Sequence, residues 1–478
     1  MSETGNLTRM QERMLVFAAI VAIFLSVLNS TNINIALPSL IEYYHTDMAT
    51  VQWIVVGYMM ATGLILPTIG YFMDKYSGRR LMLFGLILLA VASILCAVTP
   101  TIELMIGCRI LQGIAGGIIM PVPSALVYQF VPRERQLMTI SVVSMVTSVG
   151  VALGPSVSGV LIHYWGWRAI FLINLPLIFL DILLVLKFVP HYTIPSDSKL
   201  DILGLCCVSV GTVGLLLGFS RGNGAGWTSP VTIGMLVGSV ALLVFFVWHE
   251  LHIHIPLLNF TVFRHLGFTF GFMQNSVAAI ATCLAPIYMS LFLQDVLGMD
   301  SMQAGLSMFL PSILMAVMAP IAAKGAEKFS SRIVIFCGMI LLLYATWEIS
   351  HFALSTTILM FTVWLSLRYI GLGMITPMVN NFAMSSVPVQ LVSHASAMIA
   401  WTRQMISTIS VNLFSLLYSN HILLYTAQGL ASQMDAAEQA RFIECTAIND
   451  VNFYSLLILL VSAPMIYFMR DSLLERKH

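Results

Sequence analysis

Long apolar runs separated by short polar segments occupy the chain from end to end. A helix needs roughly 20 apolar residues to cross the ~30 Å hydrocarbon core of a bilayer, where backbone polar groups must be paired within the helix. The pattern predicts fourteen membrane-spanning helices. They are expected near residues 14–37, 51–72, 81–99, 102–125, 137–162, 168–189, 202–220, 231–249, 267–294, 303–323, 332–351, 355–384, 394–424 and 452–470.

Composition agrees with an all-α integral membrane protein. Of the 478 residues, 59% are hydrophobic and 9% are charged, and the mean hydropathy is +0.92. These values are typical of a chain that lies mostly in lipid. The net charge of +1 and the scattered basic residues give no reason to expect nucleic acid as a partner. The seven cysteines have neither a disulfide framework nor metal-ligand spacing, and we expect no cofactor and no metal.

The distribution of Lys and Arg predicts the orientation in the membrane, because short loops rich in these residues stay in the cytoplasm. With both termini inside, sixteen of the 22 basic residues fall on the cytoplasmic side. They are Arg9, Arg13, Lys75, Arg79, Arg80, Arg133, Arg135, Lys187, Lys199, Arg264, Lys324, Lys328, Arg332, Arg470, Arg476 and Lys477. We therefore expect an even number of spans in a multi-pass protein with both termini in the cytoplasm.

An internal repeat links the two halves of the chain. The run at residues 70–80 matches the run at residues 323–332, with Asp74 aligned to Glu327 and Arg79 to Arg332. A glycine and a proline four residues apart also recur, at positions 117 and 121 and at positions 373 and 377. Two similar apolar halves are typical of transporters built from repeated helix bundles.

The repeat predicts three parts. Residues 1–189 are expected to form an N-terminal six-helix bundle, and residues 267–478 a C-terminal six-helix bundle with a cytoplasmic tail. Residues 190–266 would then be a cytoplasmic linker followed by an inserted hairpin of two helices without a repeat partner. The charged residues at 435–444 have helical spacing, which predicts a short surface helix before the last span.

The predicted helix at residues 137–162 contains an unusual series of small residues. Gly150, Gly154 and Gly159 remove side chains at helical spacing, and Pro155 leaves a carbonyl without its helical donor. This pattern favours a hinge within the membrane. A packing seam of small residues is the alternative that the spacing leaves open.

Four segments together resemble the major facilitator superfamily, specifically its fourteen-helix drug:proton antiporter family. They are the loop motif at residues 70–80, Arg109-Ile-Leu-Gln112-Gly113, the run from Gly150 to Gly159, and the run from Trp165 to Pro176. The resemblance implies two six-helix bundles that expose a shared site alternately to either side of a bacterial inner membrane. It also implies export of small amphipathic or cationic compounds in exchange for protons, by a chain that we expect to be a monomer surrounded by lipid.

The first helix departs from this resemblance. The family usually reads Leu-Asp-Ser-Thr, whereas this chain reads Leu28-Asn29-Ser30-Thr31. An amide forms hydrogen bonds but does not exchange a proton near neutral pH. Either a substitution has removed the charge, or this protein couples to protons at another residue.

Three ionisable residues in apolar sequence are candidates for proton coupling, because charges within a membrane are costly. By resemblance, Arg109 would face the central cavity and hold neighbouring polar groups, including Asn29. Asp181 and Glu348 are the acids embedded in apolar sequence. Each could carry a proton, or could extend to the membrane interface without a role in coupling.

The resemblance also implies two further sets of residues. The two repeated loops would form a cytoplasmic gate, with Gly70, Asp74, Arg79, Arg80, Glu327 and Arg332 as its members. Polar and aromatic residues in cavity-lining spans are candidate substrate contacts, although each is more often a hydrogen bond between helices. These candidates are Trp53, Tyr58, Gln274, Asn275, Asn380, Asn381, Trp401, Arg403 and Asn412.

The sequence thus predicts a secondary active multidrug exporter coupled to proton entry. The alternative on the same scaffold is an exporter of an endogenous metabolite or lipid, with altered or no proton coupling at the first helix. The sequence contains no nucleophile–base pair, metal spacing or phosphate loop that would indicate an enzyme.

Overall fold

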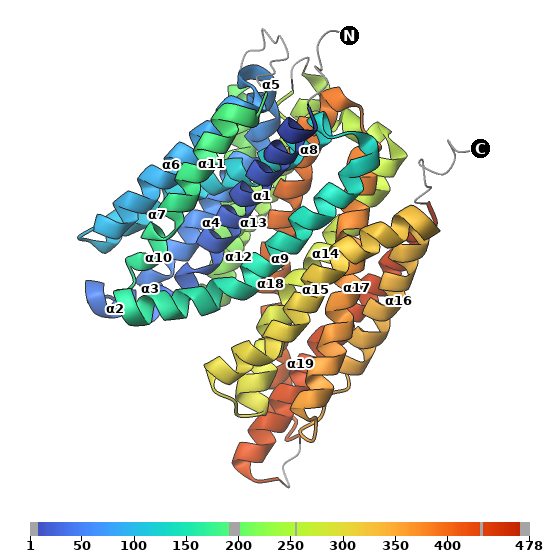
Figure 1. Ribbon diagram of the computed structural model, residues 1–478. Coiled ribbons are helices and arrows are strands. Elements are labelled where there is room, and N and C mark those ends of the chain that lie inside the picture. The colour runs from blue at the N-terminus through green and yellow to red at the C-terminus, as the bar shows by residue number, and fades with distance from the viewer. Residues whose placement is uncertain (1–7, 191–200, 254–255, 431–433, 469–478) are drawn as a thin grey trace. The chain divides into compact units, whose positions relative to one another are not determined.

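The computed structural model describes residues 8–190, 201–253, 256–430 and 434–468 (Figure 1). These residues form helices and connecting turns, without any strand. The all-α prediction is therefore confirmed for this part of the chain. Four of the basic residues that were assigned to the inner side, Lys199, Arg470, Arg476 and Lys477, lie outside the described ranges.

The described residues fall into two compact units. Unit 1 comprises Met1–Gly218, Ile233–His265 and Met384–Thr402, and unit 2 comprises Phe219–Thr232, Leu266–Ala383 and Arg403–His478. Each unit is described by its own helices and contacts.

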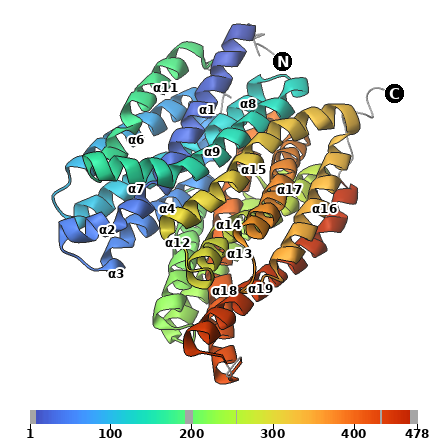
Figure 2. The same ribbon diagram turned by 60° about the horizontal axis from the view of Figure 1, so that its bottom comes forward.

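The N-terminal part of unit 1 contains helices α1 (Arg9–Thr31), α2 (Ile33–Tyr44), α3 (Met48–Val51), α4 (Trp53–Ile65), η1 (Leu66–Thr68), α5 (Ile69–Tyr76), α6 (Gly78–Val98), α7 (Ile102–Ile119), α8 (Pro121–Phe130), α9 (Arg133–Trp165), α10 (Ala169–Leu172) and α11 (Asn174–Phe188). The beginning of α1 lies at the same end of this unit as α5 and α8 (Figure 1). Helices α2 and α3 lie at the opposite end (Figure 2).

The remaining helices follow in chain order. They are α12 (Ile202–Ala225), α13 (Pro230–His252), η2 (Phe260–Arg264), α14 (Leu266–Leu291), η3 (Phe292–Val296), α15 (Ser301–Phe329), α16 (Ser331–Ile349), α17 (Ile358–Ser385), η4 (Val389–Leu391), α18 (Val392–Ala427), α19 (Ala436–Ser462) and η5 (Ala463–Phe468). The separate surface helix expected at residues 435–444 is not formed, because α19 continues from Ala436 to Ser462 without a break. The charged residues instead form the first turns of this last long helix.

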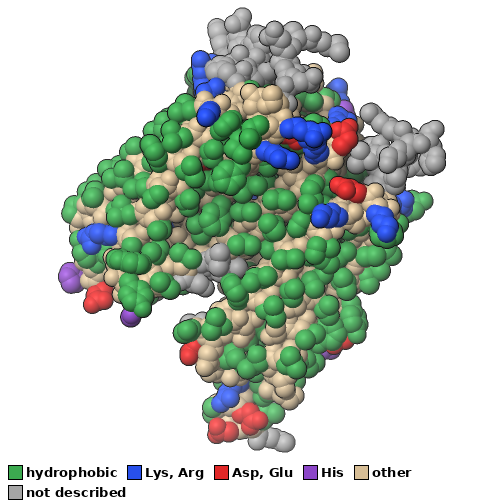
Figure 3. Space-filling view, viewed as in Figure 1, with side chains coloured by type: hydrophobic (Ala, Val, Ile, Leu, Met, Phe, Trp, Pro, Cys, Tyr) green, Lys and Arg blue, Asp and Glu red, His purple; other side chains and the backbone are tan. Residues whose placement is uncertain are grey.

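Twelve helical segments of the described chain are long and apolar enough to cross a membrane. Helices α9 and α18, which have 33 and 36 residues, are not among these twelve. On the face shown in Figure 3, hydrophobic side chains cover most of the helix surfaces and Lys and Arg gather near helix ends. The protein is therefore built to cross a membrane many times.

The repeated sequence has the same local structure in both units. Ser77 between α5 and α6 has φ 74°, and the aligned Ser330 between α15 and α16 has φ 96°. Positive φ is uncommon for residues other than glycine. Aligned glycines also pack alike: a Cβ at Gly85 would lie 2.9 Å from Ile118 Cγ2, and one at Gly338 would lie 2.9 Å from Met374 Cβ. These matches support the internal repeat.

Candidate functional site

A buried arginine joins three helices of unit 1. Arg109 of α7 is 1% exposed, and its Nη1 donates to Gln112 Oε1 at 2.7 Å and to the Asn29 carbonyl of α1 at 3.4 Å. Its Nε donates to the Ile54 carbonyl of α4 at 3.4 Å. The guanidinium carbon lies 4.6 Å from the centre of the Tyr58 ring, where a cation–π interaction adds to these bonds.

Close packing of α7 on α4 places Tyr58 against Arg109. A Cβ at Gly113 would overlap the Tyr58 carbonyl oxygen, and one at Gly116 would lie 2.5 Å from the Tyr58 hydroxyl oxygen. Larger residues at either position would push the helices apart. Gly113, which follows Arg109-Ile-Leu-Gln112, therefore allows α7 to lie close to α4.

Arg109 has no acidic partner among the described residues. The contact with Asn29 uses the backbone carbonyl of that residue. Two buried donors remain without an acceptor, namely Arg109 Nη2 and Asn29 Nδ2. Since unpaired buried donors are costly, this region of unit 1 is suited to accept a carboxylate or another hydrogen-bond acceptor.

Asp181 lies inside unit 1, on helix α11. Its exposed fraction is 0%, and neither carboxylate oxygen has a hydrogen-bond partner. This burial does not favour the interpretation that Asp181 extends to the membrane interface. A buried carboxylate without a partner is strongly destabilised in its charged form, so Asp181 is suited to hold a proton.

Glu348 has different surroundings. It is half-buried at the penultimate position of α16. Its position at a helix end is consistent with extension toward the membrane interface. The structure thus separates the two candidate acids by burial.

A second buried arginine, in unit 2, was not singled out from the sequence as a site residue. Arg368 of α17 is 0% exposed, and its Nη1 donates to Asn452 Oδ1 of α19 at 2.9 Å. Its Nη2 donates to the Ala281 carbonyl of α14 at 3.4 Å. The offset that aligns Gly117 with Gly373 also aligns Gln112 with Arg368. The sequence signal that could have identified Arg368 was its position within a predicted apolar helix.

Amide side chains flank a helix crossing in unit 2. A Cβ at Gly271 of α14 would lie 2.7 Å from Ala383 Cβ of α17. One turn away on each helix lie the predicted substrate contacts: Gln274 and Asn275 on α14, and Asn380 and Asn381 on α17. Buried atoms without partners are Gln274 Oε1, Asn275 Nδ2 and Asn381 Oδ1. Such groups are suited to bind a polar part of a ligand.

The other candidate substrate contacts have different positions. Trp53 is 46% exposed, and Arg403 is also exposed. Trp401 Nε1 donates to Thr212 Oγ1 of α12 at 3.2 Å, and Asn412 Nδ2 donates to the Thr408 carbonyl of its own helix at 2.8 Å. Trp401 therefore makes the bond between helices that the sequence left open as the alternative.

The first loop motif has a partner that the sequence did not reveal. Asp74 Oδ2 lies 2.9 Å from His394 Nε2, although the residues are 320 positions apart. Gly70 provides space for this ring, since a Cβ there would lie 2.5 Å from His394 Nδ1. Arg79 donates to the Leu186 carbonyl at the end of α11, which satisfies a terminal helix carbonyl. The adjacent Arg80 is exposed.

The second loop motif has the same backbone but different contacts. Arg332 lies over the Tyr467 ring, 4.7 Å from its centre, and Glu327 is exposed. The contact of Asp74 with His394 is therefore not reproduced at the aligned acid of unit 2.

Helix α9 packs closely on α1 at two of its three glycines. A Cβ at Gly150 would lie 3.0 Å from Val27 Cγ1, and one at Gly154 would overlap Thr31 Oγ1. With its amide nitrogen turned toward α9, Asn32 donates to the Gly154 carbonyl at 3.2 Å. Gly159 has no atom of another residue within 4 Å of such a Cβ. Helix α9 is continuous through Pro155, so a packing seam is present and the hinge stays a prediction.

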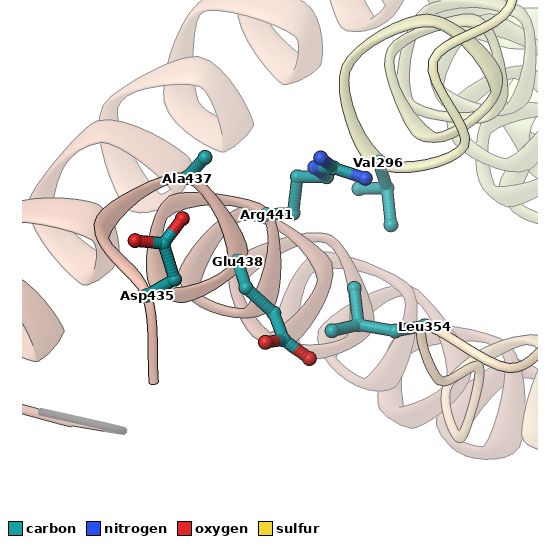
Figure 4. Close-up of a pocket in the computed structure, with 6 residues that line it drawn as sticks. All are labelled: Val296, Leu354, Asp435, Ala437, Glu438 and Arg441. Atoms are coloured by element: carbon teal, nitrogen blue, oxygen red, sulfur yellow. The ribbon is translucent and has the colours of Figure 1, made fainter. Parts of the chain in front are cut away.

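A charged pocket of about 350 Å³ lies at the start of α19 (Figure 4). It is lined by Val296, Leu354, Asp435, Ala437, Glu438 and Arg441. The Arg441 side chain points toward Val296, and the Glu438 side chain points toward Leu354. No group of three or more His, Cys, Asp and Glu side chains in the described ranges could hold a metal ion.

Sequence comparison decides the family. A family model described as Major Facilitator Superfamily matches residues 19–411. The chain belongs to the major facilitator superfamily. Members of this superfamily are transporters, so the protein is a multi-pass membrane transporter and not an enzyme.

Relatives in the superfamily cover most of the chain. The "Lincomycin resistance protein LmrB" of Listeria monocytogenes is 24% identical over 417 residues, which are 87% of this chain and 88% of LmrB. The "Putative multidrug resistance protein MdtD" of Serratia proteamaculans is 26% identical over 402 residues, 82% of each chain. The crystal structure of the human organic anion transporter MFSD10 (TETRAN) has a TM-score of 0.64 at 15% identity, and covers 94% of this chain and 99% of that chain. This likeness shows the shared fold.

Proposed function

We propose that this transporter is a secondary active multidrug exporter, which moves amphipathic or cationic compounds out of the bacterial cytoplasm in exchange for protons. The observation that carries the proposal is the similarity to LmrB and MdtD over at least 82% of both chains. Both relatives are named for drug resistance. The buried unpaired amides of α14 and α17 support a site for polar groups of such compounds.

The proposal includes fourteen spans, formed by two six-helix bundles and the α12–α13 hairpin. Helices α9 and α18 are 33 and 36 residues long and supply the two spans beyond the twelve apolar segments. The bundles expose the site alternately to the two sides. In this cycle α9 bends at Pro155, and Asp74 and Arg79 belong to the gate on the cytoplasmic side. The working form is a monomer in the inner membrane.

Residue 29 is an asparagine, so proton coupling requires an acid at another position. We assign the proton to Asp181, because it is fully buried and has no hydrogen-bond partner. A membrane potential contributes ~2.3 kcal/mol per charge per 100 mV, and each pH unit contributes ~1.4 kcal/mol. At 100 mV and one pH unit, one proton thus supplies enough free energy for roughly 500-fold accumulation of a neutral compound.

The test is ethidium uptake into inverted membrane vesicles with and without an imposed pH gradient. We expect uptake that depends on the gradient and that nigericin abolishes. In Asp181→Asn the dependence should disappear while downhill ethidium movement remains, and Glu348→Gln is the matched control that should retain it. Uptake that is the same with and without the gradient would contradict the antiport proposal.

The amide at residue 29 favours one second candidate, an exporter of an endogenous metabolite or lipid without proton coupling at the first helix. Asn29 leaves Arg109 without the acid that the family usually has nearby. This candidate predicts that vesicles move neither ethidium nor lincomycin under any gradient. Gradient-driven uptake of either compound would instead support the multidrug exporter.

A further inference from the structure

The α12–α13 hairpin has no counterpart in the internal repeat. Drug export by two six-helix bundles does not explain why the chain contains this hairpin. The segment that follows α13 offers an explanation within unit 1. Leu257 and Leu258 in this segment are fully buried. Because buried backbone groups need partners, the hydrogen bonds of this segment identify what holds it.

Two buried side chains accept hydrogen bonds from consecutive backbone N–H groups of this segment. The Leu258 N–H donates to Glu250 Oε2 of α13 at 3.2 Å. The Asn259 N–H donates to His394 Nδ1 of α18 at 3.4 Å. Glu250 is 4% exposed and His394 is 6% exposed, so both acceptors lie inside unit 1.

The bond from Asn259 fixes the proton of His394. A neutral imidazole has one donor nitrogen and one acceptor nitrogen. Because Nδ1 accepts from Asn259, the proton lies on Nε2, which faces Asp74 Oδ2 at 2.9 Å. The tautomer is thus assigned from the hydrogen-bond geometry. It lets His394 donate to Asp74 while the ring remains uncharged.

Further titratable groups surround Glu250. His249 Nε2 lies 2.9 Å from Asp201 Oδ2. A Cβ at Gly204 would overlap Asp201 Oδ2 and would lie 2.7 Å from Glu250 Oε1, so both carboxylates converge over this glycine. Asp201 therefore faces Glu250 and is paired with His249, and Asp74 faces His394. Gln129 of α8 reaches the neighbouring Ser393 at 3.2 Å, which ties the start of α18 to α8.

We propose that the α12–α13 hairpin positions His394 for the gate: Glu250 holds Leu258, Asn259 keeps the His394 proton on Nε2, and this proton holds Asp74. His394 is accordingly a positioning residue, and its gate role rests on the proposed function.

The experiment is hydrogen exchange of the purified full-length protein in lipid nanodiscs, followed by mass spectrometry. At one fixed pH, residues 256–264 should exchange about tenfold faster in His394→Ala than in the wild type, because the acceptor of the Asn259 N–H is removed. Residues 69–76 should also exchange faster, because the donor to Asp74 is removed. Equal protection of residues 256–264 in His394→Ala and in the wild type would overturn the proposal.

Two variants separate positioning from simple packing. His394→Gln keeps one donor and one acceptor, so residues 256–264 and residues 69–76 should stay as protected as in the wild type. Glu250→Ala removes the acceptor for Leu258, and both residues 256–264 and residues 69–76 should exchange faster. His421→Ala is the matched control, because His421 pairs with Asp450 in unit 2 and its loss should leave both segments protected. If residues 69–76 are unaffected in Glu250→Ala, the hairpin does not act on Asp74.

Ethidium uptake measured on the same variants keeps the two proposals apart. In His394→Ala, turnover should fall by about tenfold while the KM for ethidium stays within about twofold of the wild-type value, and His394→Gln should restore turnover. The expected exchange pattern without gradient-driven uptake would contradict the antiport proposal and leave the positioning of His394 supported. Gradient-driven uptake without the expected exchange pattern would support the antiport proposal and contradict the positioning of His394.

Discussion

Arg109 and Arg368 are buried cations whose partners in the described chain are amides and carbonyls. A guanidinium keeps its charge at all physiological pH values, and Gln112 and Asn452 orient it without neutralising it. A carboxylate introduced beside such a group should pair with it strongly. The charge balance around Arg109 in unit 1 therefore depends on which residue lies opposite Arg109 Nη2.

Asn29→Asp is expected to strengthen the dependence of transport on the pH gradient. The new carboxylate would meet the unpaired Nη2 of Arg109 and add a group that exchanges protons. The ratio of ethidium uptake with and without a gradient of one pH unit should rise by up to about tenfold, the factor that corresponds to one proton. Asn29→Ala, which adds no acid, is the control. A ratio equal to that of the wild type would mean that coupling resides elsewhere.

Arg109→Ala is expected to reduce transport by more than about tenfold while the fold is retained. No acid would be left unpaired, so the loss of stability should be far smaller than for a broken buried ion pair. Ethidium uptake and thermal stability in detergent measure the two effects. Arg109→Lys keeps the charge but cannot serve Gln112 and two carbonyls together, and should be intermediate. Normal uptake in Arg109→Ala would remove this residue from the mechanism.

At the scale of elements, glycines decide which helices approach closely. Gly113 and Gly116 bring α7 onto α4, and Gly150 and Gly154 bring α9 onto α1. The α9 contact lies beside the polar run at the end of α1, where Asn32 donates to the Gly154 carbonyl. Movement of α9 would therefore displace the end of α1, one turn from Asn29.

Gly154→Val tests this contact. The new side chain would overlap Thr31 Oγ1, and overpacking of this kind costs about 1–3 kcal/mol. We expect a lower unfolding temperature and slower ethidium uptake, because α9 must move away from α1. Gly159→Ala is the matched control, since a Cβ there meets no other residue within 4 Å. Equal effects of the two substitutions would show that α9 does not need this close approach.

At the scale of the whole molecule, superfamily membership and twelve apolar segments define a multi-pass transporter. The aligned breaks at Ser77 and Ser330, with φ of 74° and 96°, show that the repeat extends to backbone conformation. Helices α12 and α13 contain two of these twelve segments, so whether they cross the membrane bears on the total number of spans.

Fusions to alkaline phosphatase, which is active only outside the cytoplasm, test this crossing. A fusion after Trp227, in the turn between α12 and α13, should be active. A fusion after Leu258 should be inactive, because the chain would have returned to the cytoplasm. Inactivity at both positions would show that the hairpin does not cross, and the fourteen-span topology would then be wrong.

The sequence by itself determined the helices, the repeat and the family resemblance. The helix expected near 81–99 is Gly78–Val98 in the structure, and that expected near 202–220 is Ile202–Ala225. This agreement has a local cause, because helix formation in lipid depends on apolar length and on hydrogen bonds within each segment. The loop motif at residues 70–80 was also visible, since its charges and glycines lie close together in the chain.

Only the tertiary structure decided which side chains meet. The contact of Asp74 with His394 spans 320 positions, and the bond of Arg368 to Asn452 spans 84. The burial of Asp181 could not be predicted, because its helix is apolar around most of its circumference and periodicity did not identify the inward face. The rotation of each helix about its axis is set by packing against its neighbours, and that packing determines which polar groups are paired, buried or left to bind a ligand.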